Sequence, residues 1–150
     1  MFGIFGQKKK LADLGQVGID MHSHLIPGID DGVKDMDESI QSIKLLHDAG
    51  YTHLITTPHI MSDYFPNSPE TIIKGLEQVR EAVKKEGIPV KIDVAAEYYL
   101  DYPFFENFDN TTHLTINNRF LLFELSFLNP PEILNEIIFR IQTAGYIPEV

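Results

Sequence analysis

The chain has 150 residues, of which 43% are hydrophobic and 11% aromatic, as expected for one globular domain with a hydrophobic core. Its formal net charge of -10 opposes binding to a phosphate backbone, which relies on clustered lysine and arginine, so we expect no nucleic-acid partner. The absence of cysteine excludes disulfides and thiolate metal ligands and fits a cytoplasmic protein.

Residues 1–16 are expected to form a loose N-terminal tail, and residues 17–150 the folded domain. The tail carries Phe2, Phe5 and Lys8–Lys10, but it has neither the apolar core of a signal peptide nor the length of a membrane span. The alternative is that the tail contacts an anionic surface, placing the protein at the inner face of the membrane.

A strand is predicted over about residues 17–25, and it contains the run Asp20–His24, DMHSH. Alternate side chains share a face of a strand, so His22 and His24 should point together. Asp30–Gly32, DDG, follows closely. Either motif alone is typical of an exposed strand face or a turn. Together, imidazoles and carboxylates suit zinc, iron or manganese, and the sequence predicts a metal site.

The first helix is predicted to begin at Asp35, which forms a capping box with Glu38, and to end at Gly50. A second strand over 54–57 then ends at Pro58-His59. Ser68-Pro69 supplies an N-cap and a first-turn proline for a second helix, which Gly87 and Pro89 end. The apolar face predicted to be buried in that helix consists of Ile72, Leu76, Val79 and Val83.

A third strand is predicted over Val90–Ala96, ending at Glu97, and a fourth over Arg119–Leu125, ending near Glu124. Pro130-Pro131 should open a last helix, closed by Gly145 and followed by another strand at 146–150. The residues expected inside this helix are Ile133, Leu134, Ile137, Ile138 and Ile141. Alternating strands and helices predict an α/β fold with a parallel sheet and right-handed crossovers.

In such folds, functional residues gather at the carboxyl ends of the strands. The candidates at these ends and in the first loop are His22, His24, Asp30, Asp31, His59, Glu97 and Glu124. We therefore expect them to meet around shared cations. Surface or packing roles are expected for the remaining histidines, which occupy a helix, the start of a strand and a connection: His47, His53 and His113.

These motifs resemble the polymerase and histidinol phosphatase (PHP) superfamily, and more closely its bacterial tyrosine-protein phosphatase branch of capsule and exopolysaccharide synthesis. The resemblance rests on Asp20–His24 with Asp30–Gly32, on Thr56–His59, on Ala96–Tyr99 and on Phe123–Ser126. It implies a distorted β/α barrel that holds two or three ions, commonly Mn2+, with Zn2+, Fe2+ and Mg2+ as alternatives. The implied metal ligands are His22, His24, Asp31, His59, Glu97, as a bridge between two ions, and Glu124.

The family continues through a further histidine-bearing strand, two arginines and an Asp-x-His pair that this sequence lacks. Because a complete β/α barrel needs about 250 residues, we expect the N-terminal three-fifths of one, ending in the fifth strand. The catalytic residues beyond a metal-bound hydroxide are therefore unknown. We expect little or no phosphatase activity from the 150 residues alone, and exposed sheet edges that favour a homo-oligomer.

Three functions remain open. The first is metal-assisted hydrolysis of phosphotyrosine on a tyrosine autokinase, without a cysteinyl-phosphate intermediate because cysteine is absent. Tyr64 and Tyr98 would contact that substrate at the mouth of the site, although packing is the alternative role for such aromatic side chains. The second is hydrolysis of histidinol phosphate or another small phosphoester. The third is a binding module without turnover.

Overall fold

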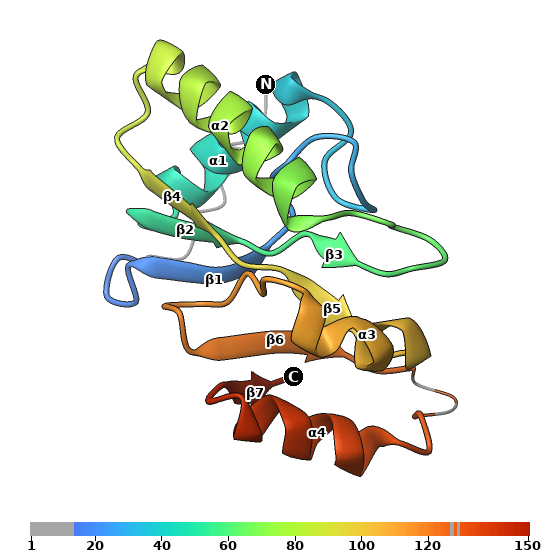
Figure 1. Cartoon of the computed structure of the whole chain (residues 1–150). Coiled ribbons are helices and arrows are strands. Elements are labelled where there is room, and N and C mark those ends of the chain that lie inside the picture. Colours follow the sequence, from blue (N-terminus) through green and yellow to red (C-terminus); the bar gives the residue numbers. More distant parts are fainter. Residues whose placement is uncertain (1–13, 127, 129) are drawn as a thin grey trace, which may run out of the picture.

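The computed structural model describes residues 14–126, 128 and 130–150 (Figure 1). The elements in chain order are β1 (Ile19–Ser23), α1 (Met36–Asp48), β2 (His53–Thr56), β3 (His59–Ile60), α2 (Pro69–Glu86), β4 (Lys91–Val94), β5 (Glu97–Tyr99), α3 (Tyr102–Asn107), the 3-10 helix η1 (Phe108–Asn110), β6 (Phe120–Glu124), α4 (Leu134–Thr143) and β7 (Ile147–Glu149). All the paired strands are parallel. The predicted α/β class is confirmed.

The strands form two sheets, ordered β1-β2-β4 and β3-β5-β6-β7. The chain passes from the first sheet to the second at Thr57-Pro58, returns to the first through α2, and passes to the second again at Ala95-Ala96. The prediction that one strand over Val90–Ala96 ends at Glu97 is therefore wrong. That segment divides at two fully buried alanines, and Glu97 begins β5 in the other sheet. Likewise His59 begins β3, after a proline that cannot donate to a strand ladder.

Helices α1 and α2 lie side by side on one face of the β1-β2-β4 sheet (Figure 1). The Asp35 side chain accepts the Glu38 N–H at 2.9 Å, as predicted, but the Glu38 carboxylate accepts the N–H of Lys34 at 2.8 Å, one residue before the cap. In α2, Ser68 and Thr71 complete the capping box, and Gly87 ends the helix in the left-handed conformation. The four side chains predicted for its apolar face are buried.

Two features of the C-terminal part differ from the sequence prediction. Helix α3, with Asp101 as its N-cap, has six residues, too few for a repeating apolar stripe to reveal it. Helix α4 begins at Leu134, later than predicted, because Pro131 lies in a turn whose carbonyl accepts the Leu134 N–H at 3.0 Å. Ile137 and Ile141 are buried in it, as expected.

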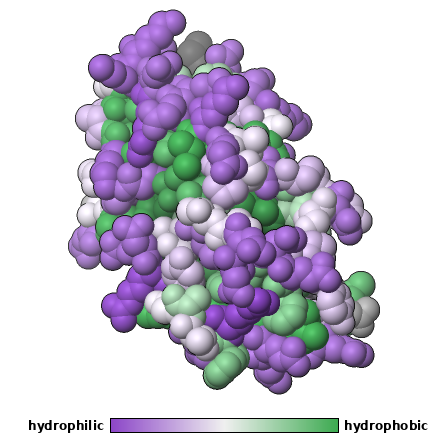
Figure 2. Space-filling view, viewed as in Figure 1, coloured by the Kyte–Doolittle hydropathy of each residue, from purple (hydrophilic) through white to green (hydrophobic). Residues whose placement is uncertain are grey.

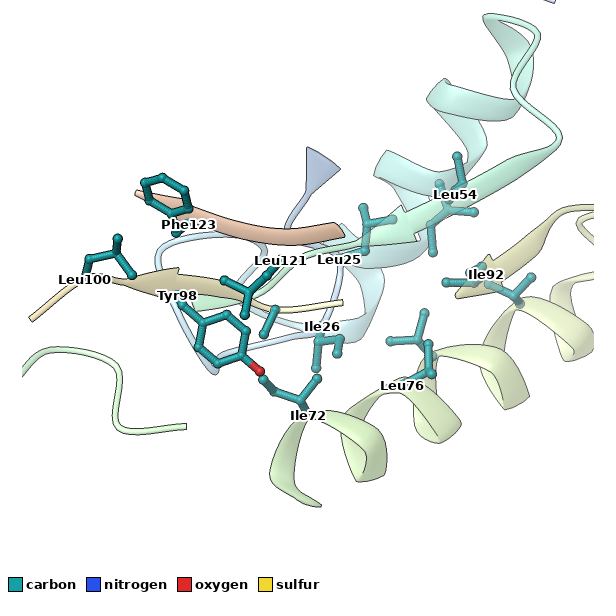
Figure 3. Close-up of a cluster of buried hydrophobic side chains, with 14 of the residues drawn as sticks. Leu25, Ile26, Leu54, Ile72, Leu76, Ile92, Tyr98, Leu100, Leu121 and Phe123 are labelled. Atoms are coloured by element: carbon teal, nitrogen blue, oxygen red, sulfur yellow. The ribbon is translucent and has the colours of Figure 1, made fainter. Parts of the chain in front are cut away.

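The core continues from α2 through both sheets (Figure 3). Ile26, in the loop after β1, packs against α2 and is 1% exposed. A Cβ on Gly75 would lie 2.3 Å from Ile26 Cγ2, so the helix packs directly on this loop. The loop that leaves the His22–His24 segment is therefore anchored in the core. The labelled members of the cluster in Figure 3 are Leu25, Ile26, Leu54, Ile72, Leu76, Ile92, Tyr98, Leu100, Leu121 and Phe123.

The folded part begins earlier than predicted. Leu14 donates its N–H to the Ala49 carbonyl at 2.7 Å, and a Cβ on Gly50 would lie 2.4 Å from the Gly15 nitrogen. Leu14 and Gly15, inside the predicted tail, therefore lie against the end of α1. Residues 1–13 of the predicted tail lie outside the described residues.

The face seen in Figure 2 is largely hydrophilic, with hydrophobic residues showing between the hydrophilic ones. No helix in the described part of the chain combines the length and apolar character needed to cross a membrane. Among the described residues, four strands pair on one side only: β1 and β4 in the first sheet, and β3 and β7 in the second.

Candidate metal centre

The six predicted metal ligands meet in one cluster, where the two sheets join. His22 comes from β1, His24 follows that strand, Asp31 comes from the next loop, His59 and Glu97 begin β3 and β5, and Glu124 ends β6. Strands β3 and β5 pair in parallel with His59 opposite Glu97, so these two side chains share a face.

The Glu97 carboxylate is the centre of the cluster. Its Oε2 lies 3.3 Å from His24 Nε2, 3.3 Å from His59 Nδ1 and 3.7 Å from His22 Nε2. His22 and His24 therefore reach the same oxygen, as their alternation along the chain predicts. One carboxylate oxygen is thus surrounded by three imidazoles.

Asp31 and Glu124 lie on either side of His59. Asp31 Oδ1 is 3.5 Å from His59 Nε2 and 3.5 Å from His24 Nδ1, and Glu124 Oε1 is 3.4 Å from His59 Nδ1. The potential ligand atoms form three overlapping groups, each with its members within 4.8 Å of one another. The groups are His22, His24 and Glu97; His24, Asp31 and His59; and His59, Glu97 and Glu124.

The electrostatics of the cluster favour positive charge at its centre. Burial disfavours the cationic form of His24, but Asp30 and Glu97 outweigh it and raise the His24 pKa to about 10 from 6.5. Burial also acts to raise the pKa of Glu97, yet the three imidazoles around it lower that pKa below its ordinary value. Glu124 has a raised pKa because of burial, with the carboxylates of Glu97 and Asp31 adding to the effect.

The donor set fits a divalent metal ion. It consists of nitrogen and oxygen ligands, the combination that zinc, iron and manganese accept. His59 Nδ1 is buried and has no hydrogen-bond partner among the described residues, although it faces the carboxylates of Glu97 and Glu124. A cation between these groups would satisfy that nitrogen and offset the repulsion between the two carboxylates.

Two neighbours that the sequence analysis did not single out hold the ligands in place. The Thr57 hydroxyl lies 3.0 Å from His22 Nδ1, which leaves Nε2 of that ring facing Glu97. Asn67 donates from Nδ2 to the His59 carbonyl at 2.8 Å, which fixes the backbone there. Thr57 lies within the Thr56–His59 motif, so its closeness in sequence to His59 could have identified it as a neighbour of the site. No sequence pattern pointed to Asn67.

Asp30, one of the candidates predicted from the sequence, also holds the ligands in place. Its side chain is 0% exposed, its Oδ1 accepts the Gly32 N–H at 3.0 Å, and its Oδ2 accepts the His59 N–H at 3.1 Å. A Cβ on Gly32 would lie 2.4 Å from the Cβ of His24, so a residue without a side chain lets this loop close on the histidine. The sequence placed Asp30 in the cluster but gave it no role separate from that of Asp31.

The predicted place of Tyr98 at the mouth of the site is wrong. Tyr98 is 1% exposed, and its hydroxyl accepts the Leu114 N–H at 2.8 Å within the core (Figure 3). The alternation along β5 turns it away from Glu97. Tyr64, in contrast, is 72% exposed in the turn between Met61 and Phe65. The Phe65 ring stacks on His59 at 5.5 Å between centroids.

The three remaining histidines lie outside the cluster. His53 lies within β2 rather than before it, with Nε2 2.8 Å from Asp93 Oδ2. His113 stacks on Phe108 at 4.4 Å, and His47 lies in the last turn of α1. The expected packing and surface roles are confirmed for these residues.

An α/β fold with histidines and carboxylates gathered where two parallel sheets meet defines a candidate metal-binding protein. The particular family follows from comparison with known proteins. The family model for capsular polysaccharide synthesis, CpsB/CapC, matches residues 18–150, and the chain belongs to this family. The predicted relationship to capsule-synthesis phosphatases is thereby confirmed.

Named relatives are 26–30% identical to the chain over the aligned residues. Tyrosine-protein phosphatase YwqE of Bacillus subtilis is 26% identical over 133 residues, which cover 88% of this chain and 52% of YwqE. Tyrosine-protein phosphatase CpsB of Streptococcus pneumoniae is 30% identical over 109 residues, covering 72% of this chain and 45% of CpsB. The chain spans about half the length of the curated relatives it matches.

A solved structure also matches. It comes from work on YwqE from Bacillus subtilis and CpsB from Streptococcus pneumoniae, which are described there as unique metal-dependent tyrosine phosphatases. The TM-score is 0.78 at 27% identity, and the match covers 87% of this chain and 53% of the other. The fold described above is therefore that of a known metal-dependent phosphatase over the matched residues.

Proposed function

We propose that the cluster binds two or three divalent ions, with manganese as the first candidate, and serves the hydrolysis of phosphotyrosine on a protein. The observation that carries this proposal is the position of Glu97, whose Oε2 lies within 3.7 Å of nitrogens from three histidines. The three overlapping ligand groups support more than one ion. Zinc, iron and magnesium are the alternative metals.

In this proposal the ligands divide by position. His22, His24 and Glu97 hold one ion, and Glu97 with Glu124 and His59 holds a neighbouring one, so that Glu97 bridges the two. Asp31 supports a further ion beside His59 or His24. Bound ions supply an activated water and neutralise the phosphoryl oxygens. The histidines and carboxylates act as ligands and not as nucleophiles.

An aromatic substrate is supported by the surroundings of His59. Phe65 stacks on this ring, so an aryl group bound beside the cluster would meet an aromatic side chain, and Tyr64 is exposed in the same turn. Cysteine is absent, which leaves no cysteinyl-phosphate route. A tyrosine autokinase of capsular polysaccharide synthesis is the proposed protein substrate, and the proposed location is the cytoplasm.

For these 150 residues we propose slow turnover. The sequence has three arginines, and the contacts of all three lie elsewhere: Arg80 with Asp93, Arg140 with Asp109 and Arg119 over Phe120. Without a guanidinium at the cluster, the metal ions alone would neutralise the charge of the transition state.

Metal-dependent hydrolysis of a phosphotyrosyl peptide by the purified chain tests the proposal. With Mn2+ added to chelator-treated protein, we expect slow hydrolysis that EDTA abolishes and that Glu97→Gln removes. A phosphoseryl peptide is the matched substrate control, and histidinol phosphate tests the small-molecule alternative. A preference for histidinol phosphate rejects the proposed substrate, and failure to bind any metal rejects the proposed centre.

Self-association through the free edge of β1 is also proposed. Val17, Ile19 and Met21, at alternate positions in and before this strand, are 65%, 41% and 52% exposed. An apolar row beside an unpaired strand edge favours association with a second copy. A monomeric mass in solution at micromolar concentration would contradict it.

A further inference from the structure

We infer that Asp30 is a positioning residue of the metal centre, and that its buried carboxylate decides which nitrogen of His24 faces the ions. The inference rests on the proposed function, because it concerns the ligands of that centre. It assigns a role to a charged side chain that is not itself one of the proposed ligands.

Asp30 joins three segments that carry ligands. Its Oδ2 lies 2.9 Å from His24 Nδ1, at the end of β1, and accepts the backbone N–H of His59, the first residue of β3. Its Oδ1 accepts the N–H of Gly32, immediately after Asp31. With 0% of the side chain exposed, these contacts replace water around the carboxylate. The Asp30 carboxylate is thus occupied by contacts with the protein, whereas the neighbouring Asp31 side chain, 66% exposed, can contact an ion.

The position of His24 alone does not determine which of its two ring nitrogens binds an ion. Through Nε2 it belongs to the group with His22 and Glu97, and through Nδ1 it belongs to the group with Asp31 and His59. A neutral imidazole offers one lone pair and one N–H, so it serves one of these groups and not both.

Asp30 determines which ring nitrogen of His24 is free to bind an ion. An ionised carboxylate only accepts hydrogen bonds, so beside Nδ1 it favours the tautomer with the proton on that nitrogen. No described residue forms a well-aligned hydrogen bond to the buried Nδ1, and the Asp30 oxygen, at 2.9 Å, is closer to it than Asp31 Oδ1, at 3.5 Å. The lone pair then lies on Nε2, toward His22 and Glu97. Carboxylates that hold a metal-binding histidine in this way raise its basicity and fix its ring.

The first experiment compares Asp30→Asn with the unmodified chain by calorimetric titration of Mn2+. Asparagine keeps an acceptor for Gly32 but replaces the second oxygen with a donor, so the contacts to His24 and His59 are lost. We expect the affinity of the site to fall about 10- to 100-fold while the fold is retained by circular dichroism. Asp93→Asn is the matched control, because Asp93 also contacts a histidine, His53, at 2.8 Å, but outside the cluster. It should leave the Mn2+ affinity unchanged.

The second experiment needs no variant. In the Zn2+-loaded chain, long-range nitrogen–proton correlation spectra report which His24 nitrogen carries the proton, and we expect Nδ1. A proton on Nε2 overturns the inference, as does an Asp30→Asn chain that folds and binds Mn2+ as tightly as the unmodified chain. If the unmodified chain binds neither ion, the proposed function fails and the inference fails with it. If instead the unmodified chain and Asp30→Asn bind metal equally well, only the inference about Asp30 fails.

Discussion

His59 and Glu97 face each other as the first residues of two adjacent parallel strands, and Nδ1 of the histidine lies 3.3 Å from Oε2 of the glutamate. The pair exists because the chain crosses from one sheet to the other just before each residue. A strand boundary, rather than a loop, therefore sets the distance between these two ligands. Sites built on strands in register hold their geometry better than sites built on loops.

Replacement of Glu97 tests this arrangement directly. Glu97→Ala removes the oxygen shared by His22, His24 and His59, so at least one ion should be lost. Replacing a residue that only hydrogen-bonds to a metal ligand weakens metal binding about 10- to 100-fold. Loss of a bridging ligand should therefore weaken metal binding more than about 100-fold. Metal content by mass spectrometry after dialysis measures it. Glu86→Ala, which removes a glutamate paired with Lys44, is the surface control. An unchanged metal content in Glu97→Ala removes Glu97 from the ligand set.

Tyr98→Phe distinguishes a core role from a substrate role. The change leaves the Leu114 N–H without its acceptor in a buried region, which should destabilise the fold by about 1–3 kcal/mol. Urea denaturation measures this loss. Tyr64→Phe is the control, because Tyr64 is exposed and should retain full stability. If Tyr98→Phe unfolds at the same urea concentration as the unmodified chain, the hydrogen bond between Tyr98 and Leu114 contributes nothing to the free energy of unfolding.

Much of the site could be predicted from local signals. The alternation of His22 and His24 and the position of Glu124 at the end of a strand depend on near neighbours in the chain, and the structure places these side chains as predicted. The break at Ala95-Ala96 was hidden because apolar residues continue across it, whereas Pro58 marked the end of the preceding strand but the two residues of β3 are too few to form a recognisable strand pattern. Which sheet each part joins depends on partners far away in the sequence.

The roles of neighbouring residues were harder to separate. Asp30 and Asp31 are the same residue type in one turn, and only the packing shows that one side chain is enclosed and the other open. Tyr98 and Tyr99 are likewise adjacent in one strand. Their faces depend on where β5 begins, and that boundary was misplaced in the sequence prediction.

Gly75→Ala should destabilise the protein even though alanine favours helices. The added Cβ would lie 2.3 Å from Cγ2 of Ile26, a residue that is 1% exposed and cannot move into solvent. Overpacking of this kind costs about 1–3 kcal/mol, which exceeds the gain of about 1 kcal/mol in helix propensity. The free energy of unfolding in urea measures the net effect. Lys74→Ala, on the exposed surface of the same helix, is the control. A more stable Gly75→Ala chain would show that α2 can shift away from the loop.

Acid should weaken the contact between β2, β4 and α2 through Asp93. Burial acts to raise the pKa of this carboxyl, but Lys91 and His53 outweigh it and hold the pKa below its ordinary value, and Arg80 adds a further contact at 3.1 Å. Because the pKa is lower in the folded than in the unfolded chain, the stabilisation is complete above about pH 4 and is lost as the pH falls through the folded value.

The measurement is the free energy of unfolding between about pH 5 and pH 2 in the unmodified chain and in Asp93→Asn. The unmodified chain should lose more stability over this range, by less than about 1 kcal/mol, because the pair is partly exposed and screened by solvent. Glu81→Gln is the control, since that side chain is exposed on α2. Parallel acid profiles for the unmodified and Asp93→Asn chains would mean that the contacts to Lys91 and His53 do not favour the ionised carboxylate in solution.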